Sequence, residues 1–93
     1  MSRPKKPRFV NFEPGVTYFK PRGIPLFQLS EVELGIDEVE AIRLKDVADL
    51  DQAACAEKMK ISVSTFQRIL DAAHQKIAQA ITQGQAIKIN TKK

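Results

Sequence analysis

The chain has 93 residues, a formal net charge of +4 and a pI near 9.4. This length allows one compact domain and leaves no room for a second independent core. The single cysteine excludes an intramolecular disulfide and favours a reducing compartment. With only one cysteine and one histidine in the chain, most kinds of zinc site are also excluded. No apolar run approaches the roughly 20 residues of a membrane span, and no apolar segment follows the basic N-terminus as in a secretory signal, so we expect a cytoplasmic protein with no membrane partner.

Charge is distributed unevenly along the chain. Residues 1–23 carry six bases against one acid, residues 24–60 nine acids against four bases, and residues 61–93 five bases against one acid. Basic ends around an acidic middle give a polarised surface, which suits a polyanion on one side. Ordinary solubility explains the same balance, so charge alone leaves nucleic-acid binding undecided.

The N-terminal third is predicted to be an arm, a hairpin and a loop. Residues 1–8 alternate proline with lysine and arginine, which favours an extended, solvated arm. Two β-prone runs, 9–12 and 16–19, flank a Pro-Gly turn signal, so we expect a small hairpin there. Further prolines and a glycine then predict a loop over 20–30.

A helical pattern begins at Ile36. Asp37, with Glu40 three residues later, fits a capping box, and this helix should run to about Val47. Asp49 or Asp51 is expected to cap a second helix over residues 52–59.

A third, longer helix should begin at the N-cap Ser62 and stop at Gly84. Its apolar residues step by three and four, at positions 66, 69, 70, 73, 77 and 81, which defines one helical face. The alternation in 86–90 predicts a short strand with Ile87 and Ile89 on one face. Its pairing partner should be the N-terminal hairpin or the same segment of a second chain.

Together these elements predict a mainly α fold. It consists of a helix-turn-helix three-helix core with a short N-terminal hairpin and a C-terminal β-strand. The expected organisation is an arm over 1–8, hairpin and loop over 9–30, the helix-turn-helix domain over 31–84, and a strand with a basic tail over 85–93.

The third helix is the candidate recognition helix, because the major groove admits one helix that is braced by the helix before it. Arginine can pair with guanine and glutamine with adenine, whereas hydroxyls and helix N-terminal amides suit phosphate. Asp71 is a carboxylate on this face, and pairing with Arg68 at i, i+3 would position the guanidinium. The predicted DNA-reading residues are Ser62, Ser64, Thr65, Gln67, Arg68, Asp71 and Gln75.

Bases outside that helix are predicted to contact the DNA backbone without reading sequence. The alternative for the arm is a disordered, solubilising tail. The residues concerned are Arg3, Lys5, Lys6 and Arg8 of the arm, and Lys20 and Arg22 of the loop.

The pattern formed by residues 37–44, 56–59, 62, 65–66 and 68–70 resembles region 4 of bacterial sigma factors. With the flanks 18–26 and 84–89, nearly the whole chain resembles a family of small bacterial and archaeal proteins predicted to bind DNA through that sigma-like helix-turn-helix. The resemblance implies double-stranded DNA as partner, transcriptional regulation, and RNA polymerase as a candidate second partner.

This chain departs from the family pattern at several positions. Lys60 stands where a turn glycine is usual, so the turn needs a strained or differently wound residue. Val63, His74 and Gln75 stand where basic residues are frequent in the family. The recognition helix is therefore expected to make fewer tight phosphate contacts, and the N-terminal arm to make more. N-terminal cysteines of some relatives are missing here, so no metal and no cofactor are expected.

No catalytic group is predicted, and we expect no enzyme. His74 lies ten or twelve residues along the same helix from Ser64 or Ser62 and cannot activate either hydroxyl; we expect it to be partly buried or solvated. Cys55, among alanines, favours core packing over redox sensing. The acids of 31–40 are interpreted as loop and first-turn charges that complement the helix dipole.

Two further expectations concern partners. The acidic block 31–51 suggests an alternative function, a protein-interaction module that docks on the transcription machinery without direct DNA contact. A homodimer is expected because a helix-turn-helix monomer makes few base contacts.

Overall fold

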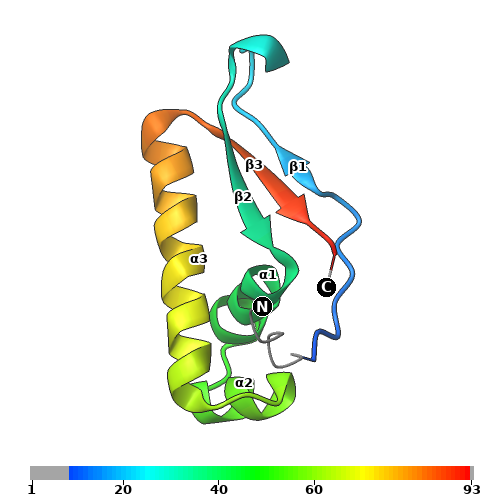
Figure 1. Cartoon of the computed structure of the whole chain (residues 1–93), viewed down its shortest axis with the longest axis vertical. Coiled ribbons are helices and arrows are strands. Elements are labelled where there is room, and N and C mark those ends of the chain that lie inside the picture. Colours follow the sequence, from blue (N-terminus) through cyan, green and yellow to red (C-terminus); the bar gives the residue numbers. More distant parts are fainter. Residues whose placement is uncertain (1–8, 93) are drawn as a thin grey trace, which may run out of the picture.

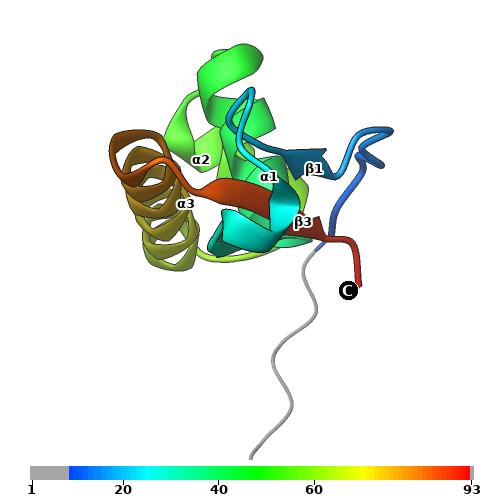
Figure 2. The ribbon, with the colours of Figure 1, turned by 90° about the horizontal axis from the view of Figure 1, so that it is seen from above.

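The computed structural model describes residues 9–92, which form three helices and a small three-stranded sheet (Figure 1). Figure 2 looks nearly down the axis of the longest helix and shows the sheet on one side of it. In chain order the elements are β1 (Tyr18–Phe19), a 3-10 turn (Leu26–Gln28), β2 (Glu31–Gly35), α1 (Ile36–Ile42), a π-helical turn (Arg43–Val47), α2 (Gln52–Met59), α3 (Val63–Gln83) and β3 (Ala86–Asn90). The three expected helices and the C-terminal strand are confirmed.

The N-terminal hairpin prediction is wrong. Only Tyr18–Phe19 forms a strand, and it pairs antiparallel with β3 instead of with residues 9–12. The backbone of 9–12 is occupied elsewhere, because the Phe9 amide donates to the Met59 carbonyl (3.0 Å) and the Asn11 amide to the Glu40 carboxylate (3.0 Å). Hydrogen bonds to residues remote in sequence therefore determine the position of residues 9–12, and the local turn signal does not.

Strand β2 was not anticipated, although its sequence alternates at period two. Val32 and Leu34 are buried while Glu31 and Glu33 are exposed. β2 pairs in parallel with β3, which is the central strand of the order β1-β3-β2. Both edges of β3 are thus paired within one chain, and a second copy is not needed to complete its ladder.

Helix α1 begins two residues earlier than expected, so the predicted capping box is wrong. Gly35 is the N-cap, and the Glu38 carboxylate, not that of Glu40, reaches back to accept from the Gly35 amide (2.8 Å). Strand β2 runs directly into the helix, which places Asp37 inside the first turn. The helical region does end at Val47, as expected, through a π-helical turn.

The caps of α2 and α3 are those expected from local signals. The Asp51 carboxylate accepts from the Ala54 amide (2.8 Å), and the Ser62 hydroxyl accepts from the Thr65 amide (3.1 Å). Gly84 ends α3 in the left-handed conformation (φ 66°), where a residue without a side chain avoids strain.

The apolar core has two parts. Cys55, Met59 and Phe66 lie fully buried between α1, α2 and α3, which confirms the packing role expected for Cys55. The second part lies between the sheet and α3 around Leu34, Ala73 and Ile89, with Ile77 and Ile87 packed against it. The predicted apolar stripe of α3 fails only at its end: Ile81 is 73% exposed and lines an apolar hollow of about 320 Å³.

Candidate nucleic-acid interface

Helices α2 and α3 are joined by three residues, Lys60, Ile61 and Ser62. Lys60 adopts the left-handed conformation (φ 58°, ψ 44°), and its amide donates to the last carbonyls of α2. This is the residue that stands in place of the usual turn glycine, and a side chain in this conformation costs about 1 kcal/mol. Ile61 packs against the core, so the turn is tied to both helices.

Helix α3 divides into a buried and an exposed face over its first four turns. Phe66, Ile69, Leu70 and Ala73 are buried. The exposed face carries the candidate DNA-reading side chains: Ser62, Ser64, Gln67, Arg68, Asp71 and Gln75 are exposed and Thr65 is half-buried. The sequence-predicted residues therefore share one surface, which extends from the N-cap Ser62 to Gln75 in the middle of the helix.

Hydroxyl groups form a small network at that end. The Ser62 hydroxyl bonds the Thr65 hydroxyl (2.9 Å) and lies 3.3 Å from that of Ser64. Arg68 Nη2 donates to Thr65 Oγ1 at 3.5 Å. The amides of Val63 and Ser64 precede the Phe66 amide, which is the first to donate within the helix (to the Ser62 carbonyl, 2.9 Å). They have no intrahelical acceptor, and an anion such as phosphate is favoured at such a helix end.

The predicted pairing of Arg68 with Asp71 is wrong. Within residues 9–92 these two side chains form no ion pair, and Arg68 turns toward Thr65 instead. The Ser62 cap holds Thr65 in place, which makes its hydroxyl a fixed acceptor one turn before Arg68. Arg68 and Asp71 are thus separate exposed groups on the same face.

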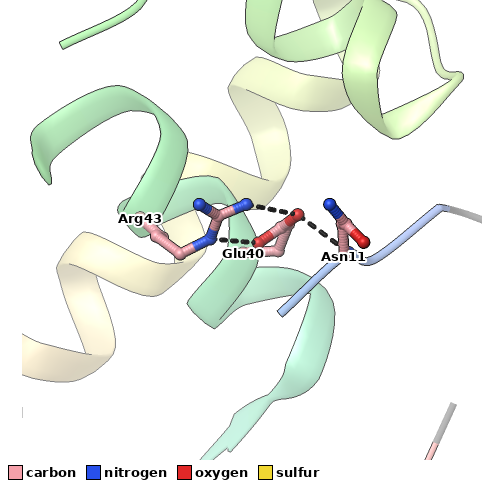
Figure 3. Close-up of polar contacts among 3 residues, drawn as sticks. All are labelled: Asn11, Glu40 and Arg43. Atoms are coloured by element: carbon pink, nitrogen blue, oxygen red, sulfur yellow. Dashed lines mark hydrogen bonds and ion pairs between the residues drawn. The ribbon is translucent and has the colours of Figure 1, made fainter. Parts of the chain in front are cut away.

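Two of the acids interpreted as loop and first-turn charges are buried and paired, although Glu38 does lie in the first turn of α1. Glu38 and Glu40 are 8% and 2% exposed. Lys76 Nζ contacts Glu38 at 2.9 Å, and Arg43 bonds Glu40 twice, at 2.8 and 3.1 Å (Figure 3). Burial alone would raise the pKa of Glu40, but hydrogen bonds from Arg43 and the Asn11 amide, with the charge of Arg43, hold that pKa below its ordinary value.

His74 also has a partner that the sequence does not reveal. Its Nε2 lies 2.6 Å from Asp46 Oδ2, and both side chains are exposed. The contact links α3 to the π-helical turn before α2. Because Asp46 lies 28 residues earlier, no local spacing signals this pair.

Of the predicted backbone contacts, the two in the described residues, Lys20 and Arg22, lie away from the candidate recognition face. Lys20 lines the hollow beside Ile81, which lies 19 residues after Ser62, or about 28 Å along the helix axis. Lys20 and the adjacent Arg22 are therefore at the opposite end of α3 from the hydroxyl network. The arm residues Arg3, Lys5, Lys6 and Arg8 lie outside the described residues.

Two searches for other kinds of site found nothing in the described part of the chain. Among residues 9–92, no three histidine, cysteine or acidic side chains gather closely enough to hold a metal ion. None of the helices in that range is both long and apolar enough to cross a bilayer.

Comparison with known proteins identifies the family. Residues 1–92 match the family described as protein of unknown function DUF134, and the chain belongs to this family. It is 57% identical to a UPF0251 protein of Desulforudis audaxviator over 96% of this chain, but spans only 58% of that relative's length. A UPF0251 protein of Caldanaerobacter subterraneus is 56% identical over 96% of this chain and 75% of its own length, and one of Clostridium botulinum is 52% identical over 97% and 57%. No solved structure matches the chain.

Proposed function

We propose that this member of the DUF134 family is a DNA-binding transcriptional regulator whose α2–turn–α3 unit acts as a helix-turn-helix of the sigma region 4 type. In this proposal α3 enters the major groove and α2 braces it. The observation that carries the proposal is the exposed face of α3, where hydroxyl, amide and guanidinium groups gather near the helix N-terminus on a helix whose other face is buried.

The chemistry of that face matches the two kinds of contact that DNA requires. Arg68 suits the acceptor pair of guanine and Gln67 the donor and acceptor of adenine. Ser64, Thr65 and the first amides of α3 suit a phosphate, which sets the register without reading sequence. Asp71 and Gln75 lie one and two turns further along the same face.

Rigidity supports the same function. Base reading needs side chains on an element that does not shift, and α3 is packed along one face by both parts of the core. The lysine and arginine residues of 1–8 would add affinity through phosphate contacts, with a steep dependence on salt.

A protein-interaction module on the transcription machinery is the second candidate. Asp46, Asp49, Asp51 and Glu57 are exposed on and around α2 and favour a basic protein partner, for which RNA polymerase is a candidate. This function predicts capture of a protein by the chain and no binding of duplex DNA even at low salt.

We also propose that the protein acts as a homodimer on two half-sites, which would double the base contacts of a single α3. Because β3 is paired on both sides by β1 and β2, the dimer contact must lie away from that strand. Sedimentation of the protein with and without a two-site duplex tests this. A complex of one chain per duplex at saturation would contradict it.

The test of the main proposal is selection of a preferred duplex from a random pool, followed by binding of that duplex and of a scrambled one. Arg68→Ala should lower the discrimination between the two by about 5- to 150-fold. Arg22→Ala is the matched control: Arg22 is exposed and is a predicted backbone contact, so its loss should weaken binding of both duplexes alike and leave the discrimination between them unchanged. If Arg68→Ala weakened binding of both duplexes equally, Arg68 would not be a base-reading residue. If the protein bound no duplex at all, the proposal would be overturned.

A further inference from the structure

Lys60 has a backbone conformation that its side chain makes unfavourable. It follows α2 directly, with φ 58° and ψ 44°. Helices that end in this left-handed conformation usually have glycine there, because a Cβ crowds the following carbonyl oxygen. The turn itself would therefore be more stable with glycine, and the geometry of the fold does not explain the lysine. Strain that the fold does not require points to a use for the side chain.

The ammonium group of Lys60 is held beside the turn without being neutralised. Its Nζ lies 5.1 Å from the centroid of the Phe9 ring, and the Phe9 amide donates to the Met59 carbonyl at 3.0 Å. Among residues 9–92 no acidic side chain forms an ion pair with Lys60, which is exposed. An aromatic ring attracts a cation but, unlike a carboxylate, leaves its full charge and its N–H donors for a further partner.

The candidate recognition face has no net charge of its own. Residues 62–75 contain one base, Arg68, and one acid, Asp71, so their formal charges cancel when the histidine is neutral. Duplex DNA carries one negative charge for about every 1.7 Å of its axis, and lysines and arginines that neutralise phosphates supply much of the affinity. The base nearest in sequence to the N-cap of α3 is Lys60, two residues before it.

The position of Lys60 suits a phosphate at the edge of the groove. Its Cα lies at most about 7 Å from that of the N-cap, because only two residues separate them. A helix end in a major groove about 12 Å wide has backbone phosphates close by on either side. The turn between α2 and α3 also lies at the end of the molecule opposite the 3-10 turn (Figure 1). A duplex in contact with the start of α3 therefore passes beside this turn.

We infer that Lys60 is a phosphate contact of the proposed DNA interface. Its ammonium group, presented by the turn and held by the Phe9 ring, binds the duplex backbone beside the start of α3. This inference rests on the proposed function and adds to it a residue outside the recognition helix. Because the contact is to phosphate and not to a base edge, it strengthens binding of every sequence alike. A lysine in place of glycine then lowers folding stability and raises affinity for DNA.

The loss of one phosphate contact has a calculable effect. Each contact contributes about −0.9 to the slope of log affinity against log salt concentration. Removing an electrostatic contact of this kind should weaken binding about 15-fold at 50 mM salt and about 4-fold at 200 mM. A substitution that merely disturbs the fold would not change this slope.

The test measures duplex affinity at both salt concentrations for two full-length variants. Lys60→Gln removes the charge and keeps the Cβ, whereas Lys60→Gly removes both. Both variants should bind the selected and the scrambled duplex more weakly by the factors above, with the discrimination between the duplexes unchanged. The Tm of Lys60→Gly should exceed that of Lys60→Gln by about 2–8 °C, because only glycine relieves the left-handed residue. Lys60→Arg should bind as the unsubstituted protein does.

The chain offers two matched controls. Asp49 also has a left-handed backbone, with φ 60°, so Asp49→Gly relieves the same strain away from the proposed contact and should not weaken duplex binding. Lys88 is an exposed lysine on β3, so Lys88→Gln changes the net charge as Lys60→Gln does. It should leave duplex affinity nearly unchanged, because salt screens charges that are distant from the contact.

The outcomes distinguish this inference from the proposed function. If Lys60→Gln binds both duplexes as tightly as the unsubstituted protein, or is weakened equally at the two salt concentrations, the inference fails while the proposed function stands. Weakening confined to the selected duplex would also overturn it, because Lys60 would then read a base. If the unsubstituted protein binds no duplex at 50 mM salt, the proposed function itself fails.

Discussion

Replacing Arg43 by methionine is expected to destabilise the protein strongly at neutral pH. The substitution removes two of the three hydrogen bonds donated to the Glu40 carboxylate, which is 2% exposed, and leaves the one from the Asn11 amide. Removing one partner of a buried ion pair costs about 3–5 kcal/mol. Because the Arg43 side chain is 32% exposed and water reaches it, we expect about 2–4 kcal/mol, or a fall in Tm on the order of 10–30 °C.

The same substitution should change the pH dependence of stability. In the unsubstituted protein the pKa of Glu40 is lowered on folding, so its contribution to stability is present above its unfolded pKa and is lost as pH falls through the folded pKa. Without Arg43, burial becomes the dominant influence and raises the pKa of Glu40. Its protonation at falling pH then relieves an unfavourable buried charge, and the loss of stability caused by Arg43→Met should shrink between pH 7 and pH 4.

The assay is thermal unfolding followed by circular dichroism at several pH values across that range. Arg22→Met is the matched control, because Arg22 is exposed and should tolerate the change. Glu40→Gln combined with Arg43→Met removes the buried carboxylate charge that Arg43→Met leaves unpaired, and should recover part of the lost stability. A loss that stays constant from pH 7 to pH 4 would refute the assignment of Glu40 as a buried, Arg43-stabilised carboxylate.

Four smaller predictions concern single side chains. Ser62→Ala should cost about 1 kcal/mol in chemical unfolding, since it removes the α3 cap; no loss would contradict that role. Asp49→Gly should stabilise by roughly 0.5–1 kcal/mol, because Asp49 has φ 60°, and destabilisation would show that its side chain has another function. His74→Ala should cost under about 0.5 kcal/mol because the pair with Asp46 is exposed; a larger loss in the same assay would give that link a structural role. Alkylation of Cys55 should be much slower in the folded than in the unfolded protein, because burial raises the pKa of the thiol, and equal rates by mass spectrometry would contradict its burial.

The helices were predictable from sequence because their signals are local. Ser62 is followed by an apolar stripe at helical spacing, and Gly84 ends it, so both limits of α3 could be predicted within one residue. The left-handed Lys60 was likewise foreseeable, since the chain must turn there without a glycine. The exposed position of the candidate DNA-reading residues follows from the same periodicity.

The tertiary contacts were not predictable in this way. Residues 9–12 have a hairpin pattern, but their amides bind Met59 and Glu40, which are remote in sequence. The alternation of β2 is a local strand signal, but its glutamates at every second position are equally typical of an acidic loop. Parallel pairing of β2 with β3 joins segments about 55 residues apart, and period alone does not identify such a partner.

The buried Glu40 site and the recognition face make different demands on the sequence. A recognition face needs only polar residues opposite an apolar stripe, which one helix specifies. The Glu40 site needs a buried carboxylate, an arginine from the turn after its helix and an amide from the segment 9–12, and these meet only in the folded chain. The role of Glu40 and Arg43 was therefore visible only in three dimensions.

The most direct measurement of the central claim is a map of amide chemical shifts in the protein titrated with a selected duplex. The account predicts the largest changes at the exposed face of α3 over residues 62–75, with little change at the 3-10 turn 26–28 at the far end. Changes confined to the acidic surface around α2, or to the hollow beside Ile81, with an unperturbed α3 face, would contradict it.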